Sequence, residues 1–409
     1  MLTTNFTRDF LNLQDVEVEK IENFNNRKRI YVKLVRKAVK CPCCNTETNK
    51  IHDYRKQVVR DCKAFGDQVE LVLSKRRYSC PNCNKRFYEP NSFLPRYYRM
   101  TTRLIESIID LLANERSFTS VAKEVGVSVS TVIRIFDHIQ YPKMQKCPSA
   151  LSIDEFKGNT GGEKFNVILC DAKNKIVLDI LPQRKENYLI DYFKKADRSQ
   201  VEYFISDMWT TYHEIAKSYF SQAVFLVDKY HWMRQVIWAF EAVRKETQKH
   251  LPSDVRKYFK RSRSLLIKRY DSIDTEQKRA VDTMLWYSSD IHEAHSSKEW
   301  FFKIIDSDDP VFVKKELKYW IDSAHDSELK PFRRCANALT HWRPGILNSI
   351  DHQYTNGFTE GCNNKIKVLK RNAYGYKRFD RFRNRILHIF SHQKTRNVIA
   401  ESCTSLRSV

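Results

Sequence analysis

The spacing of apolar positions changes several times along the chain, and each change predicts a different kind of element. In "QVELVLSKRRYSC" (residues 68–80) apolar and polar residues alternate, which predicts a strand, and "AFGDQ" at its start predicts a turn. After Pro95 the spacing becomes three and four residues, in "TTRLIESIIDLLANE" and then "FTSVAKEVGVSVSTVIRIFDHI", as in amphipathic helices. A β-rich segment is therefore expected to precede a helical one.

Short strand-like runs return from Ala150 onwards. The runs "ALSIDEF", "FNVILCDAKN" and "KIVLDILPQ" predict three strands, the last two joined by a turn at 171–175. A helical segment, the strand "VEYFISDMW", a second helix and the strand "AVFLVDKYH" follow. An antiparallel meander followed by β-α-β units indicates an α/β layer arrangement, and the same order matches the ribonuclease H-like core.

After Asp228 the pattern stays helical for over a hundred residues, with many Trp, Lys and Arg and few Gly. This stretch predicts an all-α insertion. The segment "NSIDHQYTNGF" interrupts the helices, and "TEGCNNKIKVLKRNAYG" begins a new one. Thr359 is the candidate N-cap of this helix and Gly375 its stop.

Charge narrows the class of protein. The 409 residues include 72 Lys and Arg against 49 Asp and Glu, which gives a formal net charge of +23 and a pI of about 9.5. Such an excess is typical of proteins that bind a polyanion, most often nucleic acid. Because no run of 18 apolar residues and no signal-peptide core is present, we expect a soluble cytosolic protein.

Two clusters of cysteines form a matched pair. "CPCC" and "CPNC" are C-x-x-C knuckles separated by 35 residues, and four thiolates satisfy tetrahedral zinc. We therefore predict a zinc ribbon held by Cys41, Cys44, Cys80 and Cys83, with Cys43 as an alternative to Cys44. A redox function is the weaker interpretation, since two matched pairs occur without a thioredoxin-like context.

The pattern from Phe118 resembles a helix-turn-helix closely. Ala122 is small enough to let two helices cross, Gly126 makes the turn, and an apolar pair anchors the second helix, expected from Ser130 to about Gln140. The second helix would offer four polar side chains to a DNA major groove, those of Ser128, Ser130, Thr131 and Arg134. An ordinary helical hairpin is the alternative.

Carboxylates end two of the central strands. Asp154 and Asp207 each close a hydrophobic run, where a charge is costly unless it faces solvent or binds a cation. One strand-end Asp usually caps a turn, but carboxylates that converge from several elements make an all-oxygen site for Mg²⁺. Glu155 is adjacent to Asp154 in a strand and is expected to point to the opposite face.

A single glutamate, Glu360, stands at the head of a strongly basic segment. From Gly361 to Arg385 there are nine Lys or Arg and one acid. Glu360 is either a first-turn acid that complements the helix dipole or a cation ligand that shares one helical face with Asn364, Lys367 and Arg371. Aromatic residues interleave with the charges, and these either pack or stack on bases.

These strings resemble the DDE transposases of bacterial insertion sequences, specifically the ISL3 family. The similarity rests on the two C-P-x-C knuckles, "LSIDEF", "ISDMWTTY", "VDKYH" and above all "TNGFTEGCNNKIKVLKRNAYGYKRFDRFRNRIL". It covers nearly the whole chain, to about Phe390. The resemblance implies Asp154, Asp207 and Glu360 as the acidic triad, with separations of 53 and 153 residues, and it leaves Asp228 outside the triad.

The patterns and the resemblance together imply a multidomain chain. A zinc ribbon (1–95) and an all-α helix-turn-helix domain (96–148) would precede an α/β ribonuclease H-like core. The first part of the core (149–230) is interrupted by an all-α insertion (231–350). Its final part (351–409) carries the Glu360 helix and a basic C-terminal helix.

The activity implied is that of a transposase. It would bind the terminal inverted repeats of its insertion sequence, then cleave and transfer DNA strands with two Mg²⁺ ions, replaceable by Mn²⁺, beside a structural Zn²⁺. Its partners would be double-stranded DNA at the element ends and in the target, and a second copy in a dimer on DNA, with no membrane. It would lie in the bacterial cytoplasm at the nucleoid. Five residues near the C-terminus are expected to contact DNA: Asn364, Lys367, Arg371, Lys377 and Arg378.

Two other functions fit part of the pattern. A DNA-binding regulator would use the same zinc ribbon and helix-turn-helix without catalysis. A covalent recombinase or relaxase would need a tyrosine nucleophile. The chain has 20 Tyr, but it has no His-apolar-His pair, and "RILH" is not the His-x-x-Arg order of a tyrosine recombinase.

Overall fold

The structure, a computed structural model, describes residues 11–13, 15–261, 263–352 and 354–391. Contacts within the chain divide it into two compact units. Unit 1 comprises Met1–Tyr141, Val368–Gly375 and Asn384–Val409, and unit 2 comprises Pro142–Lys367 and Tyr376–Arg383. No helix in the described residues is long and apolar enough to cross a membrane.

Unit 1 begins with a five-stranded sheet in the order β1-β2-β6-β5, with β7 paired to β6. Its strands are β1 (Val16–Phe24), β2 (Arg27–Leu34), β5 (Ile51–Ala64), β6 (Asp67–Ser79) and β7 (Arg86–Tyr88). Alternation along β6 buries Val69, Leu71 and Leu73 in the core of this sheet, as the sequence predicted. The first cysteine knuckle lies between the short strands β3 (Val39–Lys40) and β4 (Glu47–Thr48), and the second lies between β6 and β7.

Three helices follow the sheet, namely α2 (Thr102–Leu111), α3 (Phe118–Val125) and α4 (Val129–Phe136). The hydroxyl of an N-cap residue accepts a hydrogen bond from a backbone N–H at the start of each helix. The N-cap residues are Thr101 for α2, Ser117 for α3 and Ser128 for α4. Gly126 makes the turn between α3 and α4 with a φ of 76°, which confirms the helix-turn-helix. The second helix ends at Phe136 and not near Gln140, because the chain tightens there into a bond from His138 N to the Ile135 carbonyl.

The helix-turn-helix is bonded directly to the sheet of unit 1. Asp61 of β5 accepts hydrogen bonds from Oγ1 of Thr101 and from Nε of Arg103, both at 2.7 Å. Arg60 donates to the carbonyl of Gly126 at 3.1 Å. The predicted zinc ribbon and helix-turn-helix therefore form one compact unit.

A helical segment at 379–391 supplies part of the core of the helix-turn-helix through its residues in unit 1. The buried guanidinium of Arg385 lies over the rings of Phe118 and Phe136. It donates to the backbone carbonyls of Leu112, Asn114 and Arg116. His388 is also buried, with Nε2 at 2.9 Å from the Ile109 carbonyl. This part of the basic C-terminal string is therefore structural.

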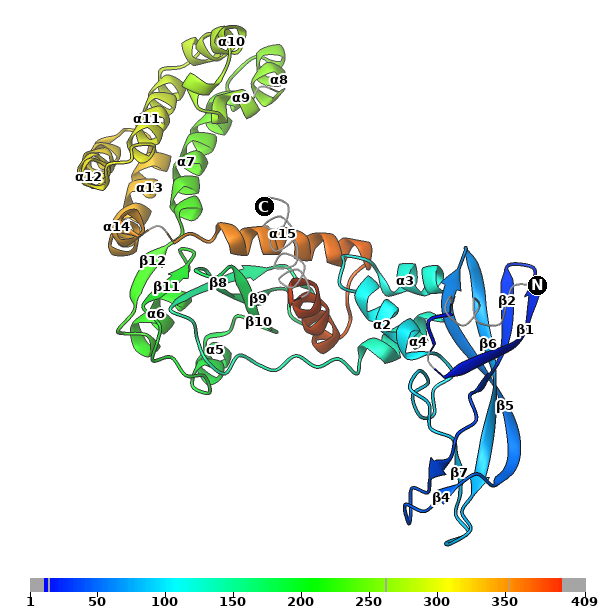
Figure 1. Ribbon diagram of the computed structural model, residues 1–409. Coiled ribbons are helices and arrows are strands. Elements are labelled where there is room, and N and C mark those ends of the chain that lie inside the picture. Colours follow the sequence, from blue (N-terminus) through cyan, green and yellow to red (C-terminus); the bar gives the residue numbers. More distant parts are fainter. Residues whose placement is uncertain (1–10, 14, 262, 353, 392–409) are drawn as a thin grey trace, which may run out of the picture. The chain divides into compact units, whose positions relative to one another are not determined.

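Unit 2 contains a second five-stranded sheet, in the order β10-β9-β8-β11-β12 (Figure 1). Its strands are β8 (Ala150–Phe156), β9 (Asn166–Asp171), β10 (Ile176–Leu181), β11 (Tyr203–Ser206) and β12 (Val224–Val227). The pairs β8–β9 and β9–β10 are antiparallel, whereas β8–β11 and β11–β12 are parallel. The predicted meander followed by β-α-β units is confirmed.

Different helices cover the two faces of this sheet. Leu151 and Ile153 of β8 pack against α5 (Glu186–Phe193) and α6 (Thr210–Tyr219). Between them in sequence, Ser152 points to the other face, where its Oγ lies 2.7 Å from Oγ1 of Thr359 in α15 (Gly357–Asn372). The alternation of β8 thus determines which helix lies on which face.

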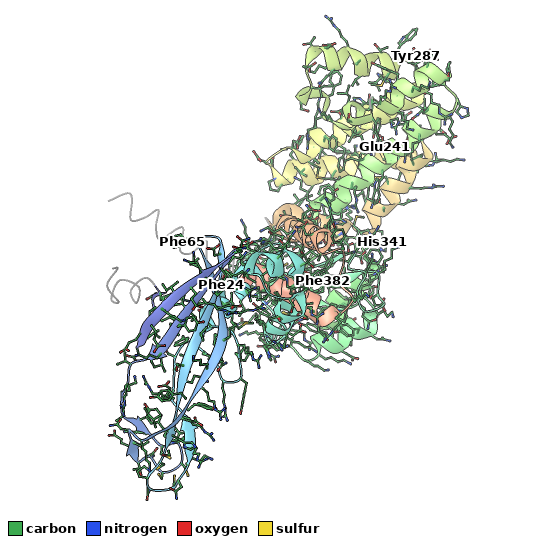
Figure 2. The ribbon with its side chains drawn as sticks, turned by 90° about the vertical axis from the view of Figure 1, so that its right-hand side faces the viewer. Phe24, Phe65, Glu241, Tyr287, His341 and Phe382 are labelled. Atoms are coloured by element: carbon green, nitrogen blue, oxygen red, sulfur yellow. The ribbon has the colours of Figure 1, made fainter. Side chains whose placement is uncertain are left out.

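The all-α insertion is confirmed in unit 2. Its helices are α7 (Lys229–Lys249), α8 (Ser253–Arg261), α9 (Arg263–Ile267), the short η1 (Tyr270–Ser272), α10 (Thr275–Trp286), α11 (Ser289–Ile305), α12 (Pro310–Asp326), α13 (Lys330–His341) and α14 (Arg343–Asp351). They share an apolar core that includes Trp232, Phe301 and Trp320. Glu241, labelled in Figure 2, is buried on α7 and accepts from Arg244 at 2.7 Å.

We expect Gly126→Ala to lower the free energy of unfolding by more than about 1 kcal/mol, because an alanine is strained at a left-handed φ. A Cβ there would also come within 1.7 Å of the Gln68 side chain on β6. Gly66→Ala is the matched control, since Gly66 has a φ of 87° but no described residue beyond its chain neighbours comes within 4 Å of the position that a Cβ would take. Urea unfolding of both variants measures the contribution of the Gln68 contact, and equal losses would contradict it.

Candidate active site

A cavity of about 450 Å³ in unit 2 is lined by four carboxylates, three of which come from separate parts of the fold. Asp154 belongs to β8, Asp207 directly follows β11, and Glu360 belongs to α15. The other lining residues are Glu155, Tyr230, His231, Arg234, Asn363, Asn364 and Lys367. The fold thus brings together the three acids that the sequence analysis singled out, despite separations of 53 and 153 residues.

Asp154 lies within β8 and not at its end, since the strand continues for two more residues. β11 pairs with β8 only as far as Ser152. The edge of β8 that faces β11 is therefore unpaired at Asp154, while β9 pairs with the opposite edge. The carboxylate is buried, with Oδ1 accepting from N of Glu155 at 2.7 Å and Oδ2 accepting from Nδ2 of Asn363 at 2.9 Å. Burial raises the pKa of Asp154 to about 7.

Asp207 follows its strand directly, as predicted. Its Oδ1 is buried and has no hydrogen-bond partner in the part of the chain that the structure describes. Burial, and then the nearby carboxylate of Glu155, raises the pKa of Asp207 to about 6. This oxygen is therefore available to a cation, which would offset the cost of ionising a buried acid.

Glu360 lies in the first turn of α15, and its side chain reaches the cavity. The helix begins at Gly357, so the prediction that Thr359 is its N-cap was wrong. Thr359 is buried inside the helix, where its hydroxyl contacts Ser152 of the sheet. The N–H of Glu360 instead donates to the carbonyl of Asn356 at 2.8 Å.

Asp228 belongs to the same buried network, although it is not among the residues that line the cavity. It is 3% exposed, and its Oδ1 accepts from N of Asn356 at 2.9 Å. Ligand atoms of Asp228, His231 and Glu360 lie within 4.8 Å of one another. Burial raises the pKa of Asp228 to about 6 and lowers the pKa of His231 to about 4. Asp228 therefore positions the start of the Glu360 helix, and its exclusion from the triad stays a prediction.

Glu155 was expected on the opposite face of the sheet, yet it lines the same cavity. β11 stops pairing with β8 at Ser152, so on that side no described strand lies beside Glu155, whereas β9 pairs with Glu155 on the other side. Arg184 donates to both carboxylate oxygens of Glu155, at 2.8 and 2.6 Å. The sequence analysis also missed Asn363, for which the only signal was the pair of asparagines three residues after Glu360.

The oxygen ligands of the cavity are of the kind that a divalent cation takes. Among the described residues, the group with ligand atoms within 4.8 Å of one another here is Asp228, His231 and Glu360, and Asp154 and Asp207 stand outside it. Asp154, Asp207 and Glu360 offer only oxygen ligands, which Mg²⁺ and Mn²⁺ prefer. Two of these acids have pKa values raised by burial, so their ionised forms need a counter-charge. The unpartnered Oδ1 of Asp207 is the most direct sign of where such a charge would bind.

In unit 1 the four predicted thiols lie together. The Sγ atoms of Cys41, Cys44, Cys80 and Cys83 are within 4.8 Å of one another, and three of the pairs are at 3.5 Å. Cys43 is exposed and stands outside this cluster, so Cys44 is the fourth thiol. Four thiols at these separations fit the tetrahedral coordination of a structural zinc ion.

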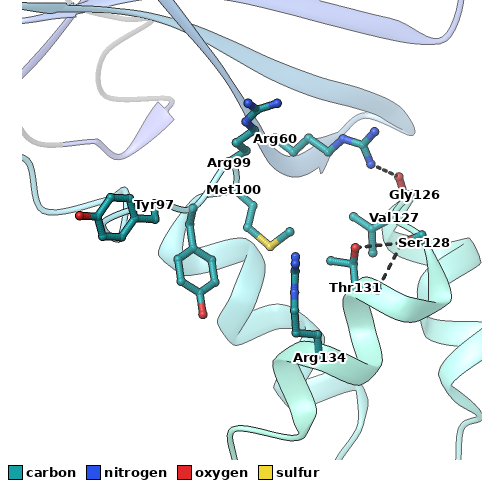
Figure 3. A pocket seen from close by; sticks show the side chains of 10 residues that line it. Arg60, Tyr97, Arg99, Met100, Gly126, Val127, Ser128, Thr131 and Arg134 are labelled. Carbon is teal, nitrogen blue, oxygen red and sulfur yellow. Dashed lines mark hydrogen bonds between the residues drawn. The ribbon is translucent and has the colours of Figure 1, made fainter.

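The predicted DNA-reading residues of the helix-turn-helix lie near the start of α4. Ser128, Ser130 and Arg134 are exposed, and Thr131 is half-buried. The Ser128 hydroxyl is engaged in capping, since it accepts from N of Thr131 at 3.2 Å. Ser128, Thr131 and Arg134 line a second cavity, within unit 1 (Figure 3).

The predicted C-terminal DNA contacts fall into two groups. Asn364 and Lys367 line the carboxylate cavity, and Lys367 Nζ donates to Oδ1 of Asn364 at 3.2 Å. The second group does not line this cavity and is exposed; it consists of Arg371, Lys377 and Arg378. Of the interleaved aromatics, Tyr376 and Phe382 are buried against each other with ring centroids 4.7 Å apart, so these two pack and do not stack on bases.

Comparison with protein families gives three matches along the chain. A family model described as a transposase, of the DDE type and the ISL3 group, matches residues 151–386. A model for the helix-turn-helix domain of transposase family ISL3 matches residues 89–140. A model for the zinc finger of the transposases IS204, IS1001, IS1096 and IS1165 matches residues 37–83. The matched ranges contain the cavity acids, the helix-turn-helix and the cysteine cluster.

One relative matches over most of the chain, and a second matches over a short segment. The transposase for insertion sequence element IS1001 from Bordetella parapertussis is 26% identical over 367 residues, which span 85% of this chain and 88% of that protein. A segment of 44 residues is 52% identical to an ATP-dependent protease from Lactococcus lactis subsp. lactis, and it covers 11% of this chain and 14% of that protein. So short an overlap carries no conclusion about the activity of the whole chain.

In the presence of a chelator, we expect Asp154→Asn to be more stable than the wild type at about pH 8. The native carboxyl, with its pKa raised to about 7, binds a proton that the unfolded chain releases near pH 4. Its contribution to stability is therefore lost as the pH rises through 7. The advantage of the variant should widen by on the order of 2 kcal/mol between about pH 5 and about pH 8.

Urea unfolding at the two pH values measures this difference. The exposed Asp191 on α5 provides the control, because Asp191→Asn should leave the pH dependence of the wild type unchanged. A wild type that gains stability relative to Asp154→Asn as the pH rises would contradict the burial argument.

Proposed function

Because the chain belongs to the ISL3 family of transposases, we propose that the carboxylate cavity of unit 2 is the site where this transposase cleaves and joins DNA strands. The observation that carries the proposal is the convergence of Asp154, Asp207 and Glu360 on one cavity from two strands and a helix. The three acids are separated by 53 and 153 residues in sequence, and the fold brings them to one cavity.

We further propose that the second sheet is a ribonuclease H-like core. The support is its strand order, β10-β9-β8-β11-β12, in which an antiparallel meander is followed by two parallel strands. Asp154 would then come from β8, the first strand of the core in chain order, and Asp207 from the end of β11, the fourth. The domain boundaries predicted from the sequence, at 95, 148, 230 and 350, belong to this proposal.

Asp154, Asp207 and Glu360 would hold two divalent cations, Mg²⁺ or Mn²⁺, in this cavity. When bound, the cations would polarise the phosphodiester and favour ionisation of the attacking oxygen. Asn363 holds Asp154 by one oxygen, and Asp228 holds the backbone before Glu360. These contacts keep the carboxylates at fixed positions on rigid elements, as in-line displacement at phosphorus requires.

Two displacement steps follow from this arrangement. In the first, a water oxygen attacks the phosphorus at the element end, the bond to the 3′ oxygen breaks, and a 3′-OH is released. In the second, this 3′-OH attacks a phosphorus of the target DNA, and a 3′ oxygen of the target leaves. Lys367 lines the cavity and would neutralise a phosphate beside the reacting bond, with Arg371, Lys377 and Arg378 contacting DNA further along.

Recognition of the element ends is proposed for unit 1. The helix-turn-helix would read the terminal inverted repeats with Ser128, Ser130, Thr131 and Arg134, and a structural Zn²⁺ would hold the cysteine knuckles. Because two ends must be brought together, a dimer on DNA is part of this proposal, as is a place at the nucleoid in the cytoplasm.

The catalytic proposal is tested with purified full-length protein, Mg²⁺ and a labelled duplex that carries the element end. We expect Asp154→Asn, Asp207→Asn and Glu360→Gln each to reduce formation of the 3′-OH at the end boundary roughly 100-fold or more, because metal ligands stabilise transition-state charge by several kcal/mol. Binding of the duplex should stay within about twofold of the wild type. Glu214→Gln serves as the control with normal cleavage.

Cleavage that survives in all three variants would refute the acidic triad. Wild-type binding without any metal-dependent cleavage would favour the DNA-binding regulator. A protein–DNA covalent adduct would favour a recombinase that uses a tyrosine nucleophile.

The zinc proposal has a matched pair of variants within one knuckle. Cys44→Ser should lower the bound zinc and destabilise unit 1, because it removes one of four thiolates from the cluster. Cys43→Ser should leave the zinc content unchanged, since Cys43 lies outside the cluster. The zinc released on treatment with a thiol-modifying reagent gives the zinc content of each variant. Equal zinc contents in the two variants would overturn the assignment.

A further inference from the structure

The cavity beside the start of α4 has a volume of about 780 Å³ and lies entirely within unit 1 (Figure 3). It is formed by three segments that are distant in sequence. Arg60 comes from β5, four consecutive residues come from 97–100, and the rest come from the helix-turn-helix. The sheet that bears the cysteine knuckles and the recognition helix thus face one common space.

The lining of this cavity is positive. Three guanidinium groups and two phenols line it, from Arg60, Arg99, Arg134, Tyr97 and Tyr98, and none of the ten lining residues is an acid. The side chains of Arg99 and Arg134 have no ion pair and no hydrogen bond to another described residue, and both are exposed. Tyr97 is 88% exposed, so its hydroxyl is also available to a ligand. A space with this composition binds an anion.

The arginines are held on a rigid support. The N–H of Arg60 donates to the carbonyl of Arg99 at 2.9 Å, and the N–H of Thr101 donates to the carbonyl of Arg60 at 2.9 Å. Arg60 also donates from its side chain to the carbonyl of Gly126, in the turn before α4. These bonds join the strand, the segment before α2 and the turn, so the distance between the arginines and the recognition helix is fixed.

We infer that this cavity is a cleft for the sugar-phosphate backbone of duplex DNA, in which Arg60 and Arg99 bind phosphates next to the major groove entered by α4. The inference rests on the proposed function, because α4 must read the element ends for its neighbours to meet that backbone. The phenols of Tyr97 and Tyr98 donate further hydrogen bonds to the same strand. The sheet and the helix-turn-helix act as a single DNA-binding surface.

Duplex DNA is favoured over a small anion by the extent of the positive lining. The arginines come from three separate segments around a cavity far larger than one phosphate, and successive phosphates along a duplex backbone present charge over such a length. Arg134 extends into the cavity from the last turn of α4 (Figure 3). In this inference Arg134 contacts the bases that α4 reads, and Arg99 contacts the phosphates.

The roles assigned to the arginines differ in a measurable way. A phosphate contact contributes equally on every sequence and adds to the salt dependence of binding, whereas a base contact contributes only on the correct sequence. Arg99 offers the cleanest test, because its side chain makes no hydrogen bond or ion pair with another described residue. Arg60 is less suitable, since its removal would also free the carbonyl of Gly126.

The experiment measures binding of full-length protein to two labelled duplexes, one with the terminal inverted repeat and one with the same bases scrambled, over a series of salt concentrations. Arg99→Ala should weaken binding to both duplexes by roughly three- to tenfold and reduce the slope of log K against log salt by about 0.9. Arg134→Ala should instead reduce the preference for the repeat by roughly five- to 150-fold. Arg55→Ala, an exposed arginine on β5 outside the cavity, should behave like the wild type.

The outcomes separate this inference from the proposed function. If the wild type shows no preference for the repeat, the proposed function fails and the inference fails with it. If the wild type prefers the repeat while Arg99→Ala matches it in affinity and salt slope on both duplexes, the inference alone is overturned. A loss in Arg99→Ala confined to the repeat would also overturn it, because Arg99 would then contact a base.

Discussion

Buried carboxylates at the open edge of β8 are the constraint around which unit 2 is organised. Asp154 and Asp228 are buried, Asp207 is half-buried with its Oδ1 enclosed, and burial raises the pKa of all three. A fold that needed only stability would place apolar side chains there, since an unpaired buried charge costs several kcal/mol. The surrounding structure instead binds both oxygens of Asp154, through N of Glu155 and Nδ2 of Asn363, and one oxygen of Asp228, through N of Asn356. Oδ1 of Asp207 and Oδ2 of Asp228 have no hydrogen-bond partner among the described residues.

This arrangement explains why α15 is attached to the sheet so firmly. Thr359 and Cys362 are buried, and the hydroxyl of Thr359 contacts that of Ser152 on β8, the strand that also carries Asp154. Glu360 and Lys367 lie on the face of the same helix that lines the cavity. A helix that is packed on one side and polar on the other delivers its carboxylate without the freedom of a loop, which suits a site where sub-ångström placement matters.

Unit 1 uses its arginines in two opposite ways. Arg385 is fully buried. Its guanidinium donates hydrogen bonds to backbone carbonyls and lies over two phenylalanine rings of the helix-turn-helix. Arg99 and Arg134 remain exposed beside α4. Net charge by itself cannot distinguish the two, because the same residue type either completes a core or meets an anion, depending on whether its donors are already satisfied.

The sequence by itself determined the elements and the chemistry of this protein. Spacing of two and of three to four residues predicted the strands and helices, the paired C-x-x-C knuckles predicted the thiol cluster, and the acids at 154, 207 and 360 predicted the carboxylate site. These features are local in composition or carry a strong motif, so they can be recognised without knowing what lies next to them.

Only the tertiary structure decided which residues surround those features. Glu155 reaches the cavity because β11 stops pairing with β8 at Ser152. Thr359 is not the N-cap of α15, and its hydroxyl is hydrogen-bonded to Ser152 of the sheet instead. Arg60 meets the helix-turn-helix because β5 packs beside α2 and the turn at Gly126. Such contacts join positions tens to hundreds of residues apart, and a pattern along one chain contains no record of which distant residue fills the space beside it.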